Sequence, residues 1–390
     1  MKWKFYSLAF VAGMSILTAC SSDDNNDNDG NGGNGNGNEI ENGTILKGTI
    51  TSDVTLAAGN TYKLSGEYIV EEGATLHIEE GVKIIAVYDD IADYILVKQG
   101  GKINAVGTPD KPIVMTSEKE EPGAWGGIHI CRRAHTNAEG GKGSSEIGGA
   151  VYGGNDDADN SGTLQYIRLE YTGFAFDEEH EANGISFYGV GNGTIVDHCQ
   201  AYKGSDDGFE FFGGSVNVSN LVAVSCSDDS FDWTEGWNGK GTNLVAYQEA
   251  ESTLGYDCDC LMECDNNGSN NAATPVAHPV LKNLILVGNG GSKQGIRLRA
   301  GTEVEIDNAK VCGKGQPLTV ETALTENALK NGTSKLTNIT LTSELSCKEG
   351  IYTHADFIAV TSNKVDANLS YSSFEDIKKE CSWMNGSWVK

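Results

Sequence analysis

A repeat in the middle of the chain limits the possible folds more than any other feature of the sequence. The hexapeptide SDDGFE at 205–210 recurs 22 residues later as SDDSFD at 227–232. The pentapeptide NLVAV at 220–224 returns 23 residues later as NLVAY at 243–247, and again as NLILV at 283–287. A period in the low twenties with short apolar runs is typical of a solenoid whose coils each contribute two or three strands.

This repeat predicts an all-β fold, a right-handed parallel β-helix with coils of about 22–24 residues. Stacked coils bury a continuous apolar core and place equivalent side chains about 4.8 Å apart. The asparagine before each repeated run is expected to form an inward ladder of amides at a bend. The alternative is a β-sandwich with regularly spaced strands, but a sandwich does not repeat its residue pattern coil by coil.

The N-terminal residues predict export and attachment to a lipid. Lys2 and Lys4 precede an apolar run that is too short to span a bilayer, which is typical of a signal peptide over 1–19. The run ends in LTAC at 17–20 and resembles the lipobox of bacterial lipoproteins, so Cys20 is the expected site of lipidation. An ordinary signal peptide with a chance cysteine is the alternative. The acidic residues after Cys20 resemble a surface-export signal, so we expect a lipid-anchored protein of the outer membrane that faces the cell exterior.

Composition divides the rest of the chain into three parts. Residues 20–43 are rich in Ser, Asp, Asn and Gly and predict a lipidated, disordered tether. Residues 44–318 are expected to form the β-helix. Residues 319–390 are expected to form the final coils and a C-terminal cap over the open end, with helices near 319–329 and 374–380. A disulfide between Cys347 and Cys381 is one way to fasten this cap.

The formal net charge of −27 excludes some partners and permits others. Such a charge disfavours nucleic acid and anionic membrane surfaces, so the only membrane contact we expect is the N-terminal lipid. It permits calcium as a cofactor, as well as neutral or cationic ligands. No other cofactor is indicated.

Alignment of the coils predicts a column of charged side chains on one outer face. Strand alternation turns the aromatic residues of each repeat inward and the residue between them outward. The outward positions of successive coils are Ser186, Glu210, Asp232, Glu263 and Arg297. Adjacent acids repel one another unless a shared proton, a calcium ion or Arg297 balances them.

This column has a catalytic and a structural interpretation. Carboxylates on neighbouring coils lie near the separation of a retaining glycosidase, which makes Glu210, Asp232, Glu263 and Arg297 candidate catalytic residues. The aspartate pairs Asp206-Asp207 and Asp228-Asp229 would contact the ligand. The structural alternative is that each pair forms a turn and bonds its local backbone. Calcium binding is the third interpretation.

Further candidate sites lie in loops. Asp156, Asp157 and Asp159 supply a calcium-like density of oxygen ligands, with a solvated turn as the alternative. Trp237 is expected on a loop where it could stack on a sugar, and Arg299 is a candidate ligand contact. Cys258, Cys260 and Cys264 permit zinc, although an exported protein favours a disulfide.

Several segments resemble a known family. GGKINAVGTPDKPIVMTS at 100–117, WGGIHI at 125–130 and SDDGFEFFGG at 205–214 are similar to β-helical surface lipoproteins of Bacteroidetes and spirochaetes with the pectin-lyase-like fold. The resemblance covers roughly residues 45–310 and implies the fold without implying an activity. The paired aspartates are also similar to those of polygalacturonases. This chain, however, has no Gly-His-Gly motif, and Arg297-Leu298-Arg299 stands where those enzymes have Arg-x-Lys.

Two functions from different classes follow from these observations. The first is a non-catalytic surface module that binds a glycan or another envelope component. The second is a polysaccharide hydrolase or lyase that uses the carboxylates of successive coils. A calcium-stabilised structural or adhesion protein is a further alternative. The sequence lacks an obvious basic group for a lyase, since only Arg297 and Arg299 are placed to take a proton.

Overall fold

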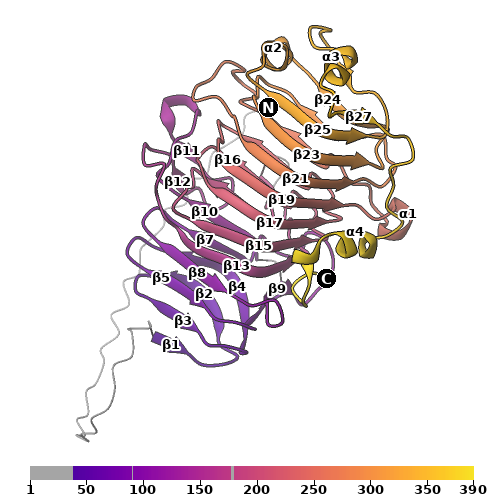
Figure 1. Ribbon diagram of the computed structural model, residues 1–390. Helices are drawn as coiled ribbons and strands as arrows, with labels where there is room; N and C mark the ends of the chain where they lie inside the picture. The colour runs from indigo at the N-terminus through magenta and orange to yellow at the C-terminus, as the bar shows by residue number, and fades with distance from the viewer. Residues whose placement is uncertain (1–37, 90, 177–179) are drawn as a thin grey trace, which may run out of the picture. The chain divides into compact units, whose positions relative to one another are not determined.

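The computed structural model describes residues 38–89, 91–176 and 180–390. Within these residues, 25 strands form one continuous network of parallel pairings. A separate antiparallel pair joins β11 (Gly143–Ser144) to β12 (Val151–Tyr152). Successive coils stack on one another, so the fold is the predicted right-handed parallel β-helix (Figure 1). Each coil has three faces, which we number in chain order.

Seven long strands form most of the first and second faces, because each of them bends at its middle and contributes to both. These strands are β13 (Gly162–Glu170), β15 (Ile195–Tyr202), β17 (Asn217–Val224), β19 (Lys240–Tyr247), β21 (Val280–Val287), β23 (Glu305–Cys312) and β25 (Lys335–Leu341).

Shorter strands complete these two faces at both ends of the stack. The first face also contains β1 (Asn38–Ile40), β3 (Val54–Leu56), β5 (Thr75–Ile78) and β8 (Lys102–Val106). The second face also contains β6 (Lys83–Ala86), β9 (Ile113–Ser117) and β27 (Lys364–Val365), while β2 (Ile45–Ile50) and β4 (Thr61–Val70) cross from the second face to the third. Since β1 already pairs with β3, the solenoid includes Asn38–Ile40, which lie inside the segment expected to be tether.

The third face consists of short, nearly straight strands. They are β7 (Tyr94–Val97), β10 (Ile128–Cys131), β14 (Ile185–Tyr188), β16 (Phe209–Phe212), β18 (Phe231–Thr234), β20 (Met262–Cys264), β22 (Gln294–Leu298), β24 (Gln316–Val320) and β26 (Ser346–Cys347).

The bend between the first and second faces carries the predicted asparagine ladder, but the ladder does not point inward. Asn220, Asn243, Asn283 and Asn308 all have positive φ, a conformation that asparagine tolerates better than most residues. The amides of the last three donate to the asparagine one coil earlier, at 2.8 to 3.0 Å, and the amide of Asn220 donates to Asp197 Oδ1 at 2.7 Å. These side chains are partly buried or exposed, because the left-handed bend directs them to the outer side of the corner. The prediction of an inward ladder is therefore wrong in direction.

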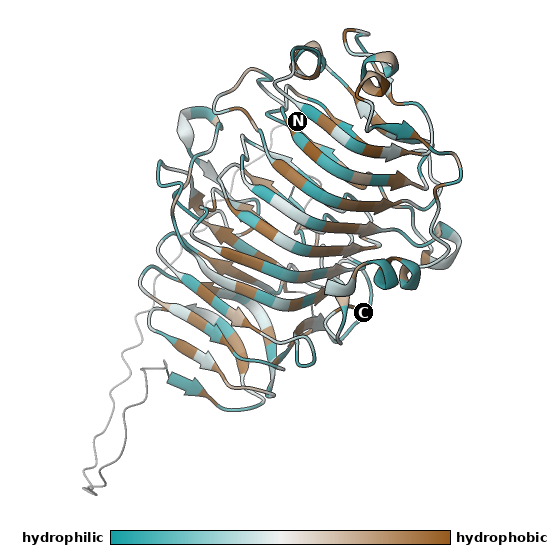
Figure 2. Ribbon diagram, in the orientation of Figure 1, coloured by the Kyte–Doolittle hydropathy of each residue, from teal (hydrophilic) through white to brown (hydrophobic). Residues whose placement is uncertain are grey.

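The interior is a stack of apolar side chains that repeats from coil to coil. Strand alternation gives brown and teal bands along the long strands in Figure 2, with the apolar members inside. Aromatic rings stack between coils: Phe187 lies on Phe211 at 5.0 Å and Phe209 on Phe231 at 5.6 Å between ring centroids. Such stacking fixes the register of the third face.

Two helices lie at the C-terminal end of the stack. They are α2 (Ala323–Asn331) and α3 (His354–Ala359), and they sit beside the last coils (Figure 1). Leu329 of α2 and Phe357 of α3 are buried in the same cluster as the solenoid core. These residues cover the apolar interior at this end.

The last residues of the chain do not cover that end, contrary to the expectation of a single cap. After β27, the chain forms α4 (Phe374–Glu380) and the 3-10 turn η2 (Ser382–Met384), which pack on the outside of the second face. The C-terminus reaches β13 and β15, where the Lys390 backbone N–H donates to Gln200 Oε1 at 2.8 Å. We call residues 366–390 the C-terminal strap. The outward valines of β17 and β19 give it an apolar surface to bury.

Two short helical elements remain, namely α1 (Glu251–Leu254) and the 3-10 turn η1 (Glu139–Gly141). Of the helices in the described part of the chain, none is long and apolar enough to cross a membrane. The predicted signal peptide and the lipidation site Cys20 lie outside the described residues.

Candidate functional site

The third face presents acids because its strands alternate aromatic and acidic residues. In β16, Phe209 and Phe211 are buried in the core, and Glu210 between them faces outward and is partly buried. In β18, Phe231 and Trp233 are buried on either side of Asp232 in the same way. The buried rings anchor each strand, so the carboxylates between them are held in fixed positions.

The structure places the predicted charged residues in one row. Glu210 is paired in register with Asp232, Asp232 with Glu263, and Glu263 with Arg297. Ser186 precedes Glu210 in this row, one coil earlier. Neighbouring parallel strands lie about 4.8 Å apart. We call Glu210, Asp232 and Glu263 the acidic column.

The second aspartate of each pair bonds to the backbone of the next coil. Asp207 Oδ1 accepts a hydrogen bond from the backbone N–H of Asp229 at 2.8 Å, and Asp229 Oδ1 accepts one from Cys260 at 2.6 Å. Both aspartates are buried. The structural alternative, in which these side chains bond their local backbone, is wrong for Asp207 and Asp229, because the coil spacing brings the following backbone within reach. Asp206 agrees with it, since its carboxylate bonds the backbone of Asp207.

Carboxylates of the turns and the acidic column converge. Potential ligand atoms of Asp207, Glu210 and Asp232 lie within 4.8 Å of one another, and the same holds for Asp229, Asp232 and Glu263. Two further such groups in the described chain are Asp206 with Asp207 and Asp228, and Asp229 with Asp259 and Cys260. The site is thus a continuous row of acids over three coils. We call this row the file; its members are Asp206, Asp207, Glu210, Asp228, Asp229, Asp232, Asp259 and Glu263.

Burial and mutual repulsion make these acids hold protons more tightly than usual. Burial, together with neighbouring carboxylates, raises the pKa of Asp207, Glu210, Asp229 and Asp232 well above the ordinary carboxyl range. Burial and the charge of Asp228 raise the pKa of Asp206 to about 8. Close like charges in a desolvated site disfavour full ionisation, so the file requires a proton, a cation or a basic side chain.

Among the described residues, ion pairs with basic side chains satisfy this requirement at the β20–β22 end. Arg297 Nη1 lies 2.8 Å from Glu263 Oε1, and Arg299 contacts both Glu263 and Asp265, the latter at 2.7 Å. Lys293 pairs with Asp259. Arg297 and Arg299 are therefore engaged in ion pairs.

Asn183 and Glu146 belong to the site, although the sequence did not indicate them. Asn183 Nδ2 donates to Glu210 Oε2 at 2.6 Å. Glu146, from the loop between β11 and β12, accepts a hydrogen bond from the hydroxyl of Tyr188 at 3.2 Å, and burial raises its pKa to about 7. Asn183 stands three residues before Ser186, as Asp207 does before Glu210, so a full coil alignment could have found it. Glu146 sits in an insertion that has no counterpart in the repeat.

The prediction that Trp237 is exposed for stacking on a ligand is wrong. Its side chain is 1% exposed, and its ring lies on Phe211 with 4.1 Å between centroids. The indole N–H donates to the Val216 carbonyl at 3.2 Å. Glu235 and Gly236 both have positive φ, which turns the chain back over the coil and carries the indole inside. This reversal is not visible in strand alternation.

The three loop aspartates predicted to bind calcium have separate partners. Asp159 is buried and pairs with Arg132, whose Nε donates to Asp159 Oδ2 at 3.1 Å. Asp157 Oδ1 lies 2.6 Å from His135 Nδ1, and Asp156 Oδ1 accepts from the Ala158 N–H at 3.3 Å. Among the described residues, Asp156, Asp157 and Asp159 do not converge as a ligand group. Each of these aspartates therefore stabilises the local structure.

The cysteines of the described chain are all unpaired, and eight of these nine are buried. The expected disulfides are therefore absent from this part of the protein, including the one suggested between Cys347 and Cys381. Cys258, Cys260 and Cys264 do not form a ligand group with one another, so the zinc alternative has no geometric support among the described residues. They behave as small apolar side chains.

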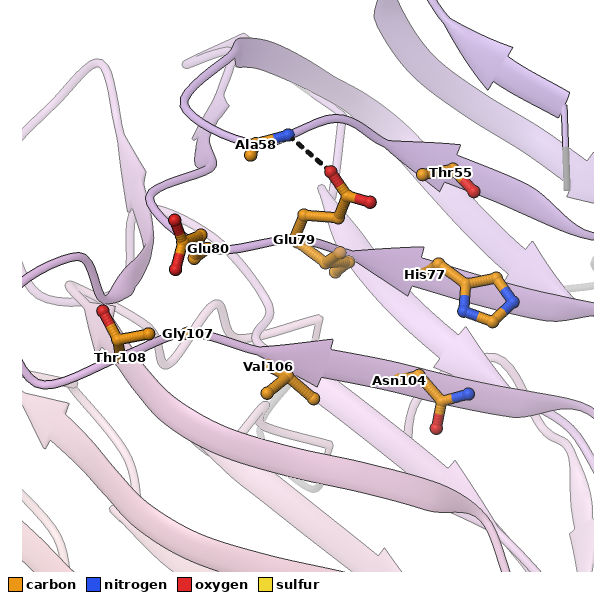
Figure 3. Close-up of a pocket in the computed structure, with 10 residues that line it drawn as sticks. Thr55, Ala58, His77, Glu79, Glu80, Asn104, Val106, Gly107 and Thr108 are labelled. Carbon is orange, nitrogen blue, oxygen red and sulfur yellow. Dashed lines mark hydrogen bonds between the residues drawn. The ribbon is translucent and has the colours of Figure 1, made fainter. Parts of the chain in front are cut away.

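A separate hollow lies on the first face, near the N-terminal end of the described chain (Figure 3). Its volume is about 520 Å³, and its floor includes His77 and Asn104, which are paired in register on β5 and β8. Glu79 Oε2 accepts a hydrogen bond from the Ala58 N–H at 2.9 Å, and Glu80 pairs with Lys111 at 2.8 Å. Both carboxylates thus serve the fold, and none of the predicted site residues lines this hollow.

The fold and the site together define a β-helical solenoid with an in-register file of carboxylates on one face. The chain belongs to the family of pectate-lyase-like β-helix domains, whose model matches residues 48–390. It is accordingly a polysaccharide-related β-helix module, which leaves open whether it binds or cleaves. No curated protein and no solved structure gives a significant match to the chain.

Proposed function

We propose that this protein is a surface module that binds a glycan, or another envelope component of similar chemistry, along its third face. The observation that carries the proposal is the acidic column, in which Glu210, Asp232 and Glu263 face outward on three successive coils. Carboxylates accept hydrogen bonds from sugar hydroxyls. A linear chain laid along the stack would meet a new carboxylate about every 4.8 Å.

A polar cavity beside the column supports this proposal. Its volume is about 680 Å³, and Thr234, two residues beyond Asp232 in β18, is part of its lining. Asn137, Glu235 and Asn270 supply donors and acceptors around it. Arg297 and Arg299 at the other side of the column are partly exposed and can donate while they remain ion-paired. These groups suit a hydroxyl-rich ligand better than an apolar one.

A hydrolase is the second candidate, and the spacing of Glu210 and Asp232 supports it. Adjacent coils place two carboxyl groups near the separation of about 5–5.5 Å that retaining glycosidases use. Such an enzyme needs one protonated and one ionised carboxyl group. Burial raises the pKa of both Glu210 and Asp232, and no basic side chain among the described residues forms an ion pair with either of them to keep it ionised. A lyase would require a free base, whereas Arg297 and Arg299 are held by Glu263. We therefore favour binding.

Glycan-array binding by the purified full-length chain tests the proposal. We expect retention on at least one polysaccharide class and a loss of at least tenfold in affinity for the Glu210→Gln/Asp232→Asn double variant. Asp156→Asn, in a loop outside the acidic column, is the matched control and should bind like wild type. The absence of any bound glycan would overturn the proposal. New reducing ends or unsaturated products in the same samples would establish the enzyme instead.

The proposal includes lipid attachment through Cys20 and exposure on the outer membrane. It is supported by the signal-like residues 1–19 and the LTAC sequence at 17–20. Cys20→Ala should move the protein from the membrane fraction to the soluble fraction of the producing cells. A variant that still requires detergent for extraction would contradict the lipoprotein assignment.

A further inference from the structure

The charges of the third face are balanced unevenly along the stack. At the β20–β22 end, Glu263 and Asp265 contact Arg297 and Arg299. At the β16 end, the groups that act most strongly on Asp207 and Glu210 are other acids, among them Asp206 and Glu146. The arginines therefore neutralise one half of the file, and the other half needs protons or a bound cation.

Asn183 contacts the half of the file without arginines, and its buried side-chain amide has an oxygen that accepts no hydrogen bond from the described residues. Asn183 is 1% exposed, and its Nδ2 donates to Glu210 Oε2 at 2.6 Å and to Ser186 Oγ at 3.0 Å. Its carbonyl oxygen, Oδ1, is buried and accepts no hydrogen bond from the described residues. Asp232 Oδ1 is also buried without a partner in the described chain. Unsatisfied buried acceptors are costly, and either a hydrogen-bond donor or a cation would satisfy them.

We propose that Asp207, Glu210 and Asp232, with the amide oxygen of Asn183, bind a hard divalent cation, Ca²⁺, at the end of the file that the arginines do not neutralise. The three carboxylates already lie within 4.8 Å of one another. The hydrogen bond from the Asp229 N–H uses Asp207 Oδ1 and leaves the second oxygen of that carboxylate for the cation. The site shares the acidic column with the proposed glycan surface but does not depend on glycan binding.

The donor set selects the metal. Carboxylate and amide oxygens prefer hard cations such as Ca²⁺, whereas thiols prefer softer metals. The neighbouring group of Asp229, Asp259 and Cys260 contains a thiol and is the poorer calcium site. The group of Asp229, Asp232 and Glu263 already holds arginine charge through Glu263. The group of Asp206, Asp207 and Asp228 has only oxygen donors and, like Asp207, Glu210 and Asp232, forms no ion pair with a basic residue among the described side chains. We prefer Asp207, Glu210 and Asp232 because Asn183, whose Oδ1 accepts no hydrogen bond from the described residues, is bonded to Glu210.

Calorimetric titration of the full-length chain with CaCl₂ at pH 8 tests the inference. We expect one saturable site in wild type and at least tenfold weaker binding in Glu210→Gln and in Asp232→Asn. Asp156→Asn, in the other acidic loop, is the control and should bind like wild type. Circular dichroism and the melting temperature establish that each variant is folded. Removal of one of several repelling charges should not lower the melting temperature of the calcium-free protein.

The variant Asn183→Asp is expected to bind calcium more tightly. Misfolding could explain a loss of binding but could not explain such a gain. A fourth carboxylate in place of the amide should tighten calcium binding at least threefold. Unchanged binding in Glu210→Gln, or no binding by wild type up to about 10 mM Ca²⁺, beyond the weakest range of extracellular calcium modules, would overturn the inference. Calcium binding without any glycan binding would support this site and reject the glycan proposal, so the two can fail separately.

Discussion

Asp229 donates its backbone N–H to the side chain of Asp207, its counterpart one coil earlier, at 2.8 Å. Asp207 therefore has a structural role in addition to any ligand binding, because its side chain joins two coils at the turn before the third face. Asp229 repeats the contact with Cys260 of the next coil. Asp207 and Asp229 are buried where they link the coils, and this burial is the largest cause of their raised pKa.

Two substitutions of Asp207 distinguish its structural hydrogen bond from the effect of its charge. Asp207→Ala should lower the free energy of unfolding by about 1–3 kcal/mol, since the buried Asp229 N–H loses its acceptor. Asp207→Asn keeps an acceptor and removes a like charge, so its stability should stay within about 1 kcal/mol of wild type. Urea unfolding at pH 7 with a chelator present measures both. Equal losses in the two variants would show that the hydrogen bond contributes nothing.

The asparagine ladder gives a second prediction, at the bend between the first and second faces. Asn243 has a φ of +60°, and its amide donates to Asn220 at 2.8 Å. Asn243→Gly keeps the backbone relaxed and loses the ladder contacts, so it should cost about 1 kcal/mol. Asn243→Val also strains the backbone and should cost about 1–3 kcal/mol more. Equal urea midpoints for the two variants would contradict a role for the left-handed conformation.

The sequence predicted the fold and the acidic column for the same physical reason. A coil period of 22 or 23 residues fixes which side chains stack, so Glu210, Asp232 and Glu263 could be aligned without coordinates. Features that break the period could not be predicted in this way. The burial of Trp237 depends on two consecutive residues with positive φ, and Glu146 reaches the site from an insertion.

The C-terminal strap shows a different limit of sequence analysis. Its helix α4 falls on residues 374–380, where the sequence suggested a short helix. Its position on the second face depends on contacts between residues far apart in the chain, such as Lys390 with Gln200. The pattern of apolar residues predicts where a helix forms, but it does not predict which surface that helix will cover.

Removal of a tryptophan tests how the strap is held. Trp388 is fully buried, and its ring lies 5.2 Å from His198 and 6.0 Å from Tyr166 between centroids. Trp388→Ala should increase amide hydrogen exchange in residues 381–390 and leave β18 protected, because the strap can open without unfolding the solenoid. Trp383→Ala, which removes a partly buried ring, should have a smaller effect. Equal exchange in β18 and the strap would indicate a single cooperative unit.

The raised pKa of Asp206 predicts how stability depends on pH in the absence of calcium. The folded value of about 8 lies above the ordinary aspartate value of about 3.9, so the folded protein binds this proton more tightly than the unfolded chain does. The stabilisation from that proton is complete below about pH 4 and is lost as the pH rises through about 8. Asp206→Asn cannot ionise and should not suffer this loss.

The difference between wild type and Asp206→Asn reports Asp206 together with the carboxylates coupled to it, because groups that do not interact with Asp206 titrate alike in both proteins and cancel. In chelator, wild type should lose stability relative to the variant between pH 5 and 8, by up to about 1.4 kcal/mol for each pH unit. Urea unfolding at four pH values measures this slope. Added calcium should flatten it, since the cation replaces the protons of the file. Parallel stability curves in chelator would mean that Asp206 titrates as an ordinary surface carboxylate and that the file is better solvated than its burial indicates.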